Sequence, residues 1–185
     1  VGDVVLESGY LNDRPRLTVD PDTHTIHVLQ VISDRTSRVT VIDGATLTVI
    51  ASAPLPDLRL IRAGFHRASQ SAYAAPQAGD MGLHEISLEP ETLGQSRHFI
   101  PTPVRPSHID VHLATRRIYA TGATGGLIAI DGNTRQVIAN TALVARTVAV
   151  DQATRQVYVT TDDDVLILDP DTLATVSSVS IPQMG

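Results

Sequence analysis

The sequence has 185 residues, of which 42% are hydrophobic and 3% aromatic, and its formal net charge is −6. This length is enough for one domain with a core, and a core with so few aromatic residues must be aliphatic, which favours strands. The negative charge argues against a nucleic-acid-binding protein. Because the chain has no cysteine, disulfides, thiolate metal sites and cysteine nucleophiles are excluded. No apolar run is long enough to predict a membrane span.

A ten-residue motif occurs four times in the chain. Each copy contains an apolar residue, an Asp or His, a turn with a hydroxyl residue, and then an alternating strand. The copies occupy residues 19–28, 65–74, 111–120 and 150–159. The Asp or His stands at 20, 66, 112 and 151, so the copies are 46, 46 and 39 residues apart. A repeat of this length that is built from strands alone is typical of a β-propeller.

A second motif is a tight turn that opens with an acidic residue, continues with Gly or Pro, and has Thr three residues after the acid. The four turns occupy residues 43–47, 89–93, 131–135 and 169–173. These residue types at these positions favour β-turns, and an apolar strand flanks each turn on both sides. Each repeat therefore holds four consecutive strands. We predict an all-β fold, a β-propeller with four-stranded antiparallel blades, of which four are visible.

The repeats set the expected boundaries of one propeller domain over residues 1–185. The blades are predicted at residues 14–56, 57–104, 105–144 and 145–185, with residues 1–13 as the outer strand of a preceding blade. Val4 to Ser8 resembles such an outer strand, although the fourth repeat already has its own. The sequence begins at Val and shows no signal peptide. We therefore expect a processed product or part of a larger propeller, with a closed four-blade ring as the competing possibility.

The innermost strand of each repeat alternates apolar and more polar residues, so one of its faces is expected in the core. The residues predicted to be buried between blades are Leu17, Val19, Ile109, Val111, Val148 and Val150.

The segments Tyr119-Ala120-Thr121-Gly122 and Tyr158-Val159-Thr160-Thr161, each followed by a strand and a Thr-containing turn, resemble the YVTN-type propeller repeat. Residues 130–138 and Arg105-Pro106 fit the same repeat. The likeness is strong in the third and fourth repeats, fair in the first, and weak in the second. Relatives of this repeat include bacterial surface proteins, lactonase-like propellers and the propellers of quinoprotein amine dehydrogenases. The resemblance implies an extracytoplasmic propeller. It brings no catalytic residues and leaves any cofactor open.

Basic residues gather where the innermost strands begin, at one end of the predicted channel. This set comprises Arg14, Arg16, Arg59, Arg62, Arg105, His108 and Arg146. Arg16, Arg62 and His108 occupy matching positions at the channel mouth, where converging side chains would suit a carboxylate or phosphate. Alternatively, each Arg pairs with a nearby acid such as Asp13, Asp57 or Asp110.

No metal site is predicted from the His and Asp residues. His66 and His112 replace Asp in the first motif, and hydrogen bonding within the turn explains them better than a metal spread around a ring. Asp162 to Asp164 lie at one end of a strand and Asp169 and Asp171 at the other, roughly 16 Å away at about 3.3 Å per residue. They cannot share one calcium ion.

These observations favour a non-catalytic ligand- or protein-binding propeller, that is, a scaffold. The alternatives are a lactonase-like or lyase-like enzyme, in which Asp110 would orient His108 as general base, and the propeller subunit of a redox enzyme. Whether the chain is an enzyme stays open. The ligand-binding candidates are Arg16, Arg62, His108 and Asp110. The expected partners are another protein or the remaining blades of the same propeller, and a small anionic ligand.

Overall fold

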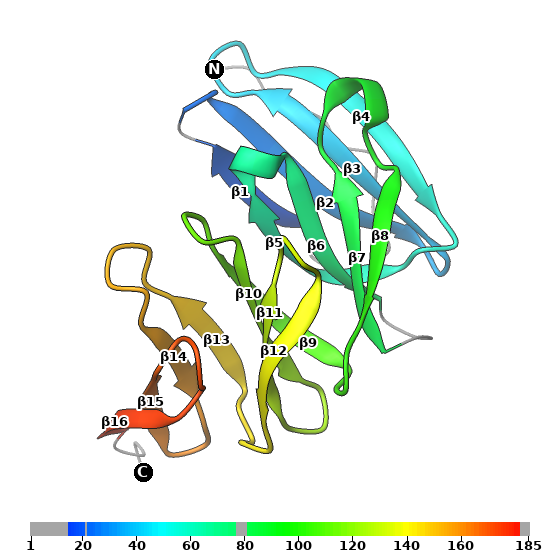
Figure 1. Cartoon of the computed structure of the whole chain (residues 1–185). Helices are drawn as coiled ribbons and strands as arrows, with labels where there is room; N and C mark the ends of the chain where they lie inside the picture. Colours follow the sequence, from blue (N-terminus) through cyan, green and yellow to red (C-terminus); the bar gives the residue numbers. More distant parts are fainter. Residues whose placement is uncertain (1–14, 21, 77–80, 182–185) are drawn as a thin grey trace. The chain divides into compact units, whose positions relative to one another are not determined.

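The computed structural model describes residues 15–20, 22–76 and 81–181, apart from the side chains of residues 61 and 97. In this part of the chain, sixteen strands form four antiparallel four-stranded sheets (Figure 1). The helical elements among the described residues are two three-residue 3-10 turns, η1 (Arg67–Ser69) and η2 (Pro90–Thr92). None of the described residues forms a helix of the length and hydropathy that crossing a membrane would need. The predicted all-β fold is confirmed.

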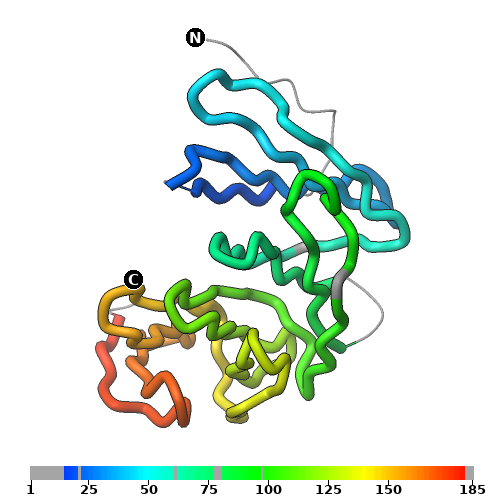
Figure 2. The backbone as a smooth tube through the Cα atoms, turned by 45° about the horizontal axis from the view of Figure 1, so that its top comes forward, coloured from blue at the N-terminus to red at the C-terminus, as the bar shows by residue number. Residues whose placement is uncertain are grey.

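Within each sheet the strands follow one another in sequence order, so each sheet is a meander of consecutive hairpins, which is one blade of a β-propeller. The first blade contains β1 (Arg16–Asp20), β2 (Thr25–Ser33), β3 (Thr36–Asp43) and β4 (Thr48–Pro56), and the second contains β5 (Leu60–His66), β6 (Ser71–Pro76), β7 (Gly82–Ser87) and β8 (Ser96–Pro101). The third contains β9 (Pro106–His112), β10 (Arg117–Gly122), β11 (Leu127–Asp131) and β12 (Gln136–Thr141), and the fourth contains β13 (Thr147–Val150), β14 (Val157–Thr160), β15 (Asp164–Leu168) and β16 (Thr175–Ser180). Figure 2 shows the chain running back and forth within each blade.

The chain forms two compact units, which are described separately. Unit 1 contains residues 1–79 and 84–99, that is, the first blade and most of the second, and unit 2 contains residues 80–83 and 100–185, with the third and fourth blades. The core of unit 1 consists of aliphatic side chains from its two blades. Its buried members are Leu29, Val39, Leu55, Leu60, Ala72, Ala74, Ile86 and Leu88. The two blades of this unit are therefore joined by an apolar layer of the kind predicted between blades.

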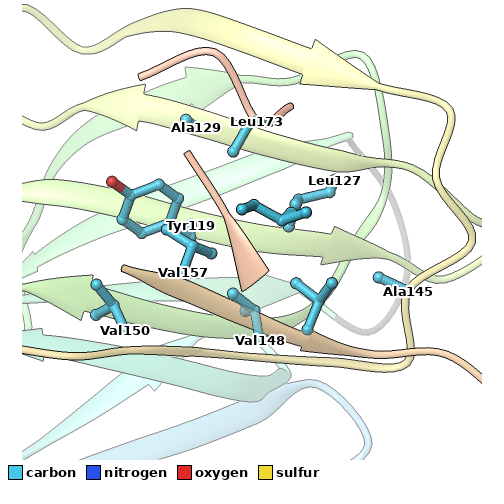
Figure 3. Close-up of a cluster of buried hydrophobic side chains, with 10 residues drawn as sticks. Tyr119, Leu127, Ala129, Ala145, Val148, Val150, Val157 and Leu173 are labelled. Atoms are coloured by element: carbon cyan, nitrogen blue, oxygen red, sulfur yellow. The ribbon is translucent and has the colours of Figure 1, made fainter. Parts of the chain in front are cut away.

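Unit 2 has a corresponding core between the third and fourth blades (Figure 3). Its buried members are Tyr119, Leu127, Ala129, Ala145, Val148, Val150, Val157, Val159, Leu168 and Leu173. Val148 and Val150 come from the innermost strand β13, and Val157 and Val159 from β14, so alternate residues of both strands face the third blade. Burial of this alternating face fixes the register of the blade.

The innermost strands are buried as predicted in the third and fourth blades but not in the first. Ile109, Val111, Val148 and Val150 are 2–8% exposed. Leu17 and Val19, in contrast, are 63% and 55% exposed, so the prediction was wrong for both. The physical reason is positional: these side chains occupy the face that a preceding blade covers elsewhere, and no blade precedes β1 within the described residues. The predicted strand at Val4 to Ser8 lies outside those residues, as do the start of the first predicted blade and Arg14.

The acidic turns are alike in three blades and different in the second. Asp43, Asp131 and Asp169 each accept backbone N–H groups two and three residues ahead, at 2.7–3.0 Å. The N–H of the Thr in each turn is the main reason that the pKa of each carboxyl lies below its ordinary value. Glu89, however, precedes the η2 turn and makes no side-chain capping bond there. The prediction of four turns of one type was therefore wrong for the second blade, where the acidic side chain is one methylene longer.

Candidate functional site

The four candidate ligand-binding residues are half-buried and lie on the innermost strands. Arg16 lies on β1 and Arg62 on β5, both in unit 1, whereas His108 and Asp110 lie on β9 in unit 2. The two residues of β9 are two positions apart and so share one face of the strand. The meeting of all four side chains at one channel mouth stays a prediction.

Asp110 joins the innermost strands of the third and fourth blades. Its Oδ1 accepts the N–H of Val111 and its Oδ2 accepts the N–H of Val150, both at 2.8 Å. Val150 belongs to β13, so the carboxylate supplies an acceptor that the ladder of β13 with β14 cannot supply on this edge. Charge-assisted bonds of this kind are among the stronger hydrogen bonds. Asp110 therefore has a structural role at the junction of the two blades.

His108 lies beside Asp110 and reaches the same neighbouring strand. The N–H of Val148 points to its Nδ1 at 3.5 Å, which is long for a hydrogen bond. Both polar residues of the β9 face thus contact backbone N–H groups of β13, at Val148 and Val150.

Gln152 is a residue that the sequence patterns did not single out. It follows Asp151 in the first turn of the fourth blade, and its side-chain amide pairs with the backbone of the third blade. Its Nε2 donates to the carbonyl of Val111 at 3.0 Å, and its Oε1 accepts the N–H of Leu113 at 2.8 Å. The amide thus extends the end of β9 as a neighbouring strand would. The repeat pattern does not indicate a role for Gln152, because the other repeats have Pro, Arg and Leu at this position.

The imidazole rings at the first turns hydrogen-bond locally, as predicted. His66 Nδ1 lies 2.8 Å from Ser69 Oγ, and His112 Nδ1 lies 2.7 Å from Thr115 Oγ1. The N–H of Thr115 also points to His112 Nδ1 at 3.3 Å, so this nitrogen accepts and the ring proton belongs on Nε2. Nε2 then donates to the carbonyl of Gln152 at 3.2 Å. The ring of His112 thus closes the same blade junction as Asp110.

Tyr119, the cross-strand partner of Asp110 on β10, makes a further contact with the fourth blade. Its hydroxyl donates to the carbonyl of Pro170 at 3.1 Å, and burial raises the pKa of Tyr119 to about 12. Beside it, Arg117 of the third blade and Arg155 of the fourth both pair with Asp171. The ring of Tyr119, which marks the repeat in the sequence, thus also carries a polar contact between blades.

Two of the basic residues at the predicted channel mouth pair with acids. Arg59 lies 3.6 Å from Asp34, and Arg146 lies 2.7 Å from Asp162. The interpretation that these arginines pair with nearby acids therefore holds for both, although the acids belong to turns between second and third strands rather than being Asp13, Asp57 or Asp110. Among the residues that the structure describes, no three His, Asp or Glu side chains are grouped closely enough to hold a metal ion.

Comparison with known proteins supports the β-propeller fold. No family model matches the chain, and no curated protein matches it. The chain is similar to a chain of the solved structure titled "Crystal Structure of Mitotic Checkpoint Complex", with a TM-score of 0.69 and 10% sequence identity. The likeness covers 89% of this chain and 50% of that one, so the chain spans about half the length of the solved chain. In all, 829 solved chains match, so an architecture this widely shared does not identify a function.

Proposed function

We propose that the chain is a non-catalytic propeller scaffold that binds a protein or a small ligand. The observation that carries the proposal is the use of Asp110: both of its oxygens join β9 to β13 through backbone N–H groups. The residues best suited to acid–base chemistry in the sequence thus hold two blades together. The similarity to a chain from a multiprotein complex agrees with protein partners, although at 10% identity it supports the fold alone.

The small ligand that the scaffold would take is an anion at Arg16 and Arg62. These residues occupy the same repeat position on β1 and β5 of unit 1, and both are half-buried. Guanidinium groups bind carboxylate and phosphate oxygens in pairs. His108 occupies the matching position in the third blade and would join them at a common channel mouth.

Thermal unfolding in the presence of phosphate or citrate tests the anion site. A ligand that binds the folded state raises the melting temperature in a concentration-dependent way. We expect that response from the parent chain and its loss in Arg62→Ala, whereas Arg35→Ala, at an exposed arginine in the turn between β2 and β3, keeps it. No shift at millimolar anion, or equal shifts in both variants, would count against the site.

The same chain assayed with a panel of lactones separates scaffold from enzyme. The scaffold proposal expects no hydrolysis above the rate in buffer, with or without added divalent metal. Turnover that His108→Ala abolishes in a folded variant would instead support the lactonase-like alternative and its general base.

The resemblance to the YVTN-type repeat also leads us to propose an extracytoplasmic location. Cell fractionation that finds the protein only in the cytoplasm would contradict it.

A further inference from the structure

The fourth blade has one buried face and one exposed apolar face. The buried face belongs to the core of unit 2. The opposite face is defined by two rows of cross-strand neighbours, Ala149–Tyr158–Ile167–Ser177 and Thr147–Thr160–Val165–Val179. Val179 is 59% exposed, and Tyr158, Val165 and Ile167 are half-buried. No other sheet follows β16 within the described residues.

The first blade exposes an apolar face of the complementary kind. Leu17 and Val19 project from β1 and are 63% and 55% exposed. They hold the repeat positions of Val148 and Val150, which are 2% and 8% exposed in the core of unit 2. The side chains that insert into a neighbouring blade in one repeat are thus uncovered in another.

The junction inside unit 2 shows how two such faces fit. There, Val148 and Val150 pack against the face of the third blade that carries Tyr119, whose hydroxyl reaches the next blade at Pro170. Tyr158 holds the repeat position of Tyr119, but its hydroxyl donates to Oε1 of Gln156, just before its own strand, at 2.8 Å. The chain therefore carries both halves of a further junction, one on its fourth blade and one on its first.

Charge permits this junction. In unit 2, Arg117 pairs with Asp171 across the blades. The residues at the same repeat positions in the further junction would be Gln156 of the fourth blade and Ala45 of the first. Both are neutral, so bringing the two faces together buries no unpaired charge at that position. A buried unpaired charge there would destabilise the junction.

We propose that the chain associates with a second copy of itself head to tail, with the exposed face of β13–β16 of one copy packed on the Leu17 and Val19 face of β1 of the other. A contact between two different faces closes into a ring when the rotation allows it. The likeness covers 50% of the solved chain, so two copies together supply about that length. We therefore expect an assembly of two chains.

Sedimentation equilibrium of the full chain over a range of concentrations tests the proposal. The expected mass is that of two chains, dissociating to one on dilution. Leu17→Asp and Val179→Asp each place a charge on one of the two faces, and each should weaken association at least tenfold, which corresponds to about 1.4 kcal/mol. Val144→Asp is the matched control, because Val144 is equally exposed, at 62%, but precedes β13 and lies on neither face.

Mixing the two variants gives the sharpest result. Leu17→Asp keeps an intact fourth-blade face and Val179→Asp keeps an intact first-blade face, so the mixture should recover an association that neither variant shows alone. Far-ultraviolet circular dichroism checks that both are folded, as their exposure predicts. The proposal fails if the parent chain keeps the mass of one chain at every concentration. It also fails if the mixture does not associate, or if Val144→Asp weakens association as much as Leu17→Asp does.

Discussion

The two blade junctions, one in each unit, share an apolar layer and differ in their polar contacts. In unit 1, the first and second blades are joined by the aliphatic core and by ion pairs whose acids are exposed, Arg67 with Asp22 and Arg59 with Asp34. Buried Ser37 of the first blade also accepts the N–H of Leu60 in the second, at 2.9 Å. In unit 2, half-buried Asp110 and the amide of Gln152 bind the backbone of the neighbouring blade. An apolar layer thus stacks the blades in both units, and single polar side chains tie particular strands together. Unit 2 should depend on Asp110 and Gln152 more than unit 1 depends on the residues at the same repeat positions, Thr18 and Arg67.

The largest effect is expected from an apolar position that is buried in one blade and exposed in another. Val150→Asp places an unpaired charge in the core of unit 2 and should lower the free energy of unfolding by about 3–5 kcal/mol. Val19→Asp, at the same repeat position in the first blade, should change it by about 0.5 kcal/mol or less in dilute protein. Urea denaturation measures both, and similar losses would show that the face of Val19 is covered in solution.

The carboxylate of Asp110 should have the next largest effect. Asp110→Ala leaves the N–H groups of Val111 and Val150 without their acceptor, which should cost about 1–3 kcal/mol in urea denaturation. Thr18→Ala removes the residue at the same repeat position of β1 and should cost about 0.5 kcal/mol or less. Asp110→Asn should lose less than Asp110→Ala, because one carbonyl oxygen remains to accept. Equal effects at Asp110 and Thr18 would contradict the structural role of the carboxylate.

The residue after the first-turn Asp or His provides a third comparison. Gln152→Ala removes two hydrogen bonds to the third blade and should cost about 1–2 kcal/mol. Arg67, at the same position in the second blade, makes an exposed ion pair with Asp22 at 3.3 Å, so Arg67→Ala should cost about 0–1 kcal/mol. The Arg67 effect should shrink further in high salt, whereas that of Gln152 should not. A salt-sensitive Gln152 effect would argue against the amide pairing.

Much of the fold could be predicted from the sequence because it is encoded by short-range periodicity. Two-residue alternation, turn residues at fixed offsets and the repeat spacing predicted the four-stranded blades and the local bonding of His66 and His112. The exposure of Leu17 could not be predicted, since it depends on which blade is adjacent rather than on the strand itself. The prediction for the turn at Glu89 was wrong for a different reason, because the pattern treated Asp and Glu as equivalent.

The candidate site was harder to predict because its residues carry several possible roles. Asp110 and His108 were chosen as polar residues on an innermost strand, and the structure gives them backbone partners in the next blade. Gln152 escaped notice because one glutamine in a turn is unremarkable until the carbonyl of Val111 and the N–H of Leu113 lie beside it. Long-range pairing of a side chain with a backbone leaves no periodic signal. Repeat position predicts where a residue lies, but not what it binds.

The smallest expected effect is on the pH dependence of stability. It concerns one repeat position, which holds His27 in unit 1 and Tyr119 in unit 2. His27 is 9% exposed and stacks on Phe65 at 6.2 Å between ring centroids. Burial lowers the pKa of His27 below its ordinary 6.5, although the nearby Asp20 acts in the opposite direction. The unfolded chain therefore binds the proton first as the pH falls, so stability is full above pH 6.5 and declines below it. For Tyr119, the raised pKa of about 12 keeps the phenol neutral in the folded state, so stability declines as the pH rises from 10 towards 12.

We expect His27→Phe to remove part of the acid-side decline in melting temperature and to leave the alkaline side unchanged. Tyr119→Phe should remove part of the alkaline-side decline and leave the acid side unchanged. Melting curves of the parent and both variants across the pH range measure this. Parallel pH profiles for all three proteins would show that neither ring is buried in its neutral form.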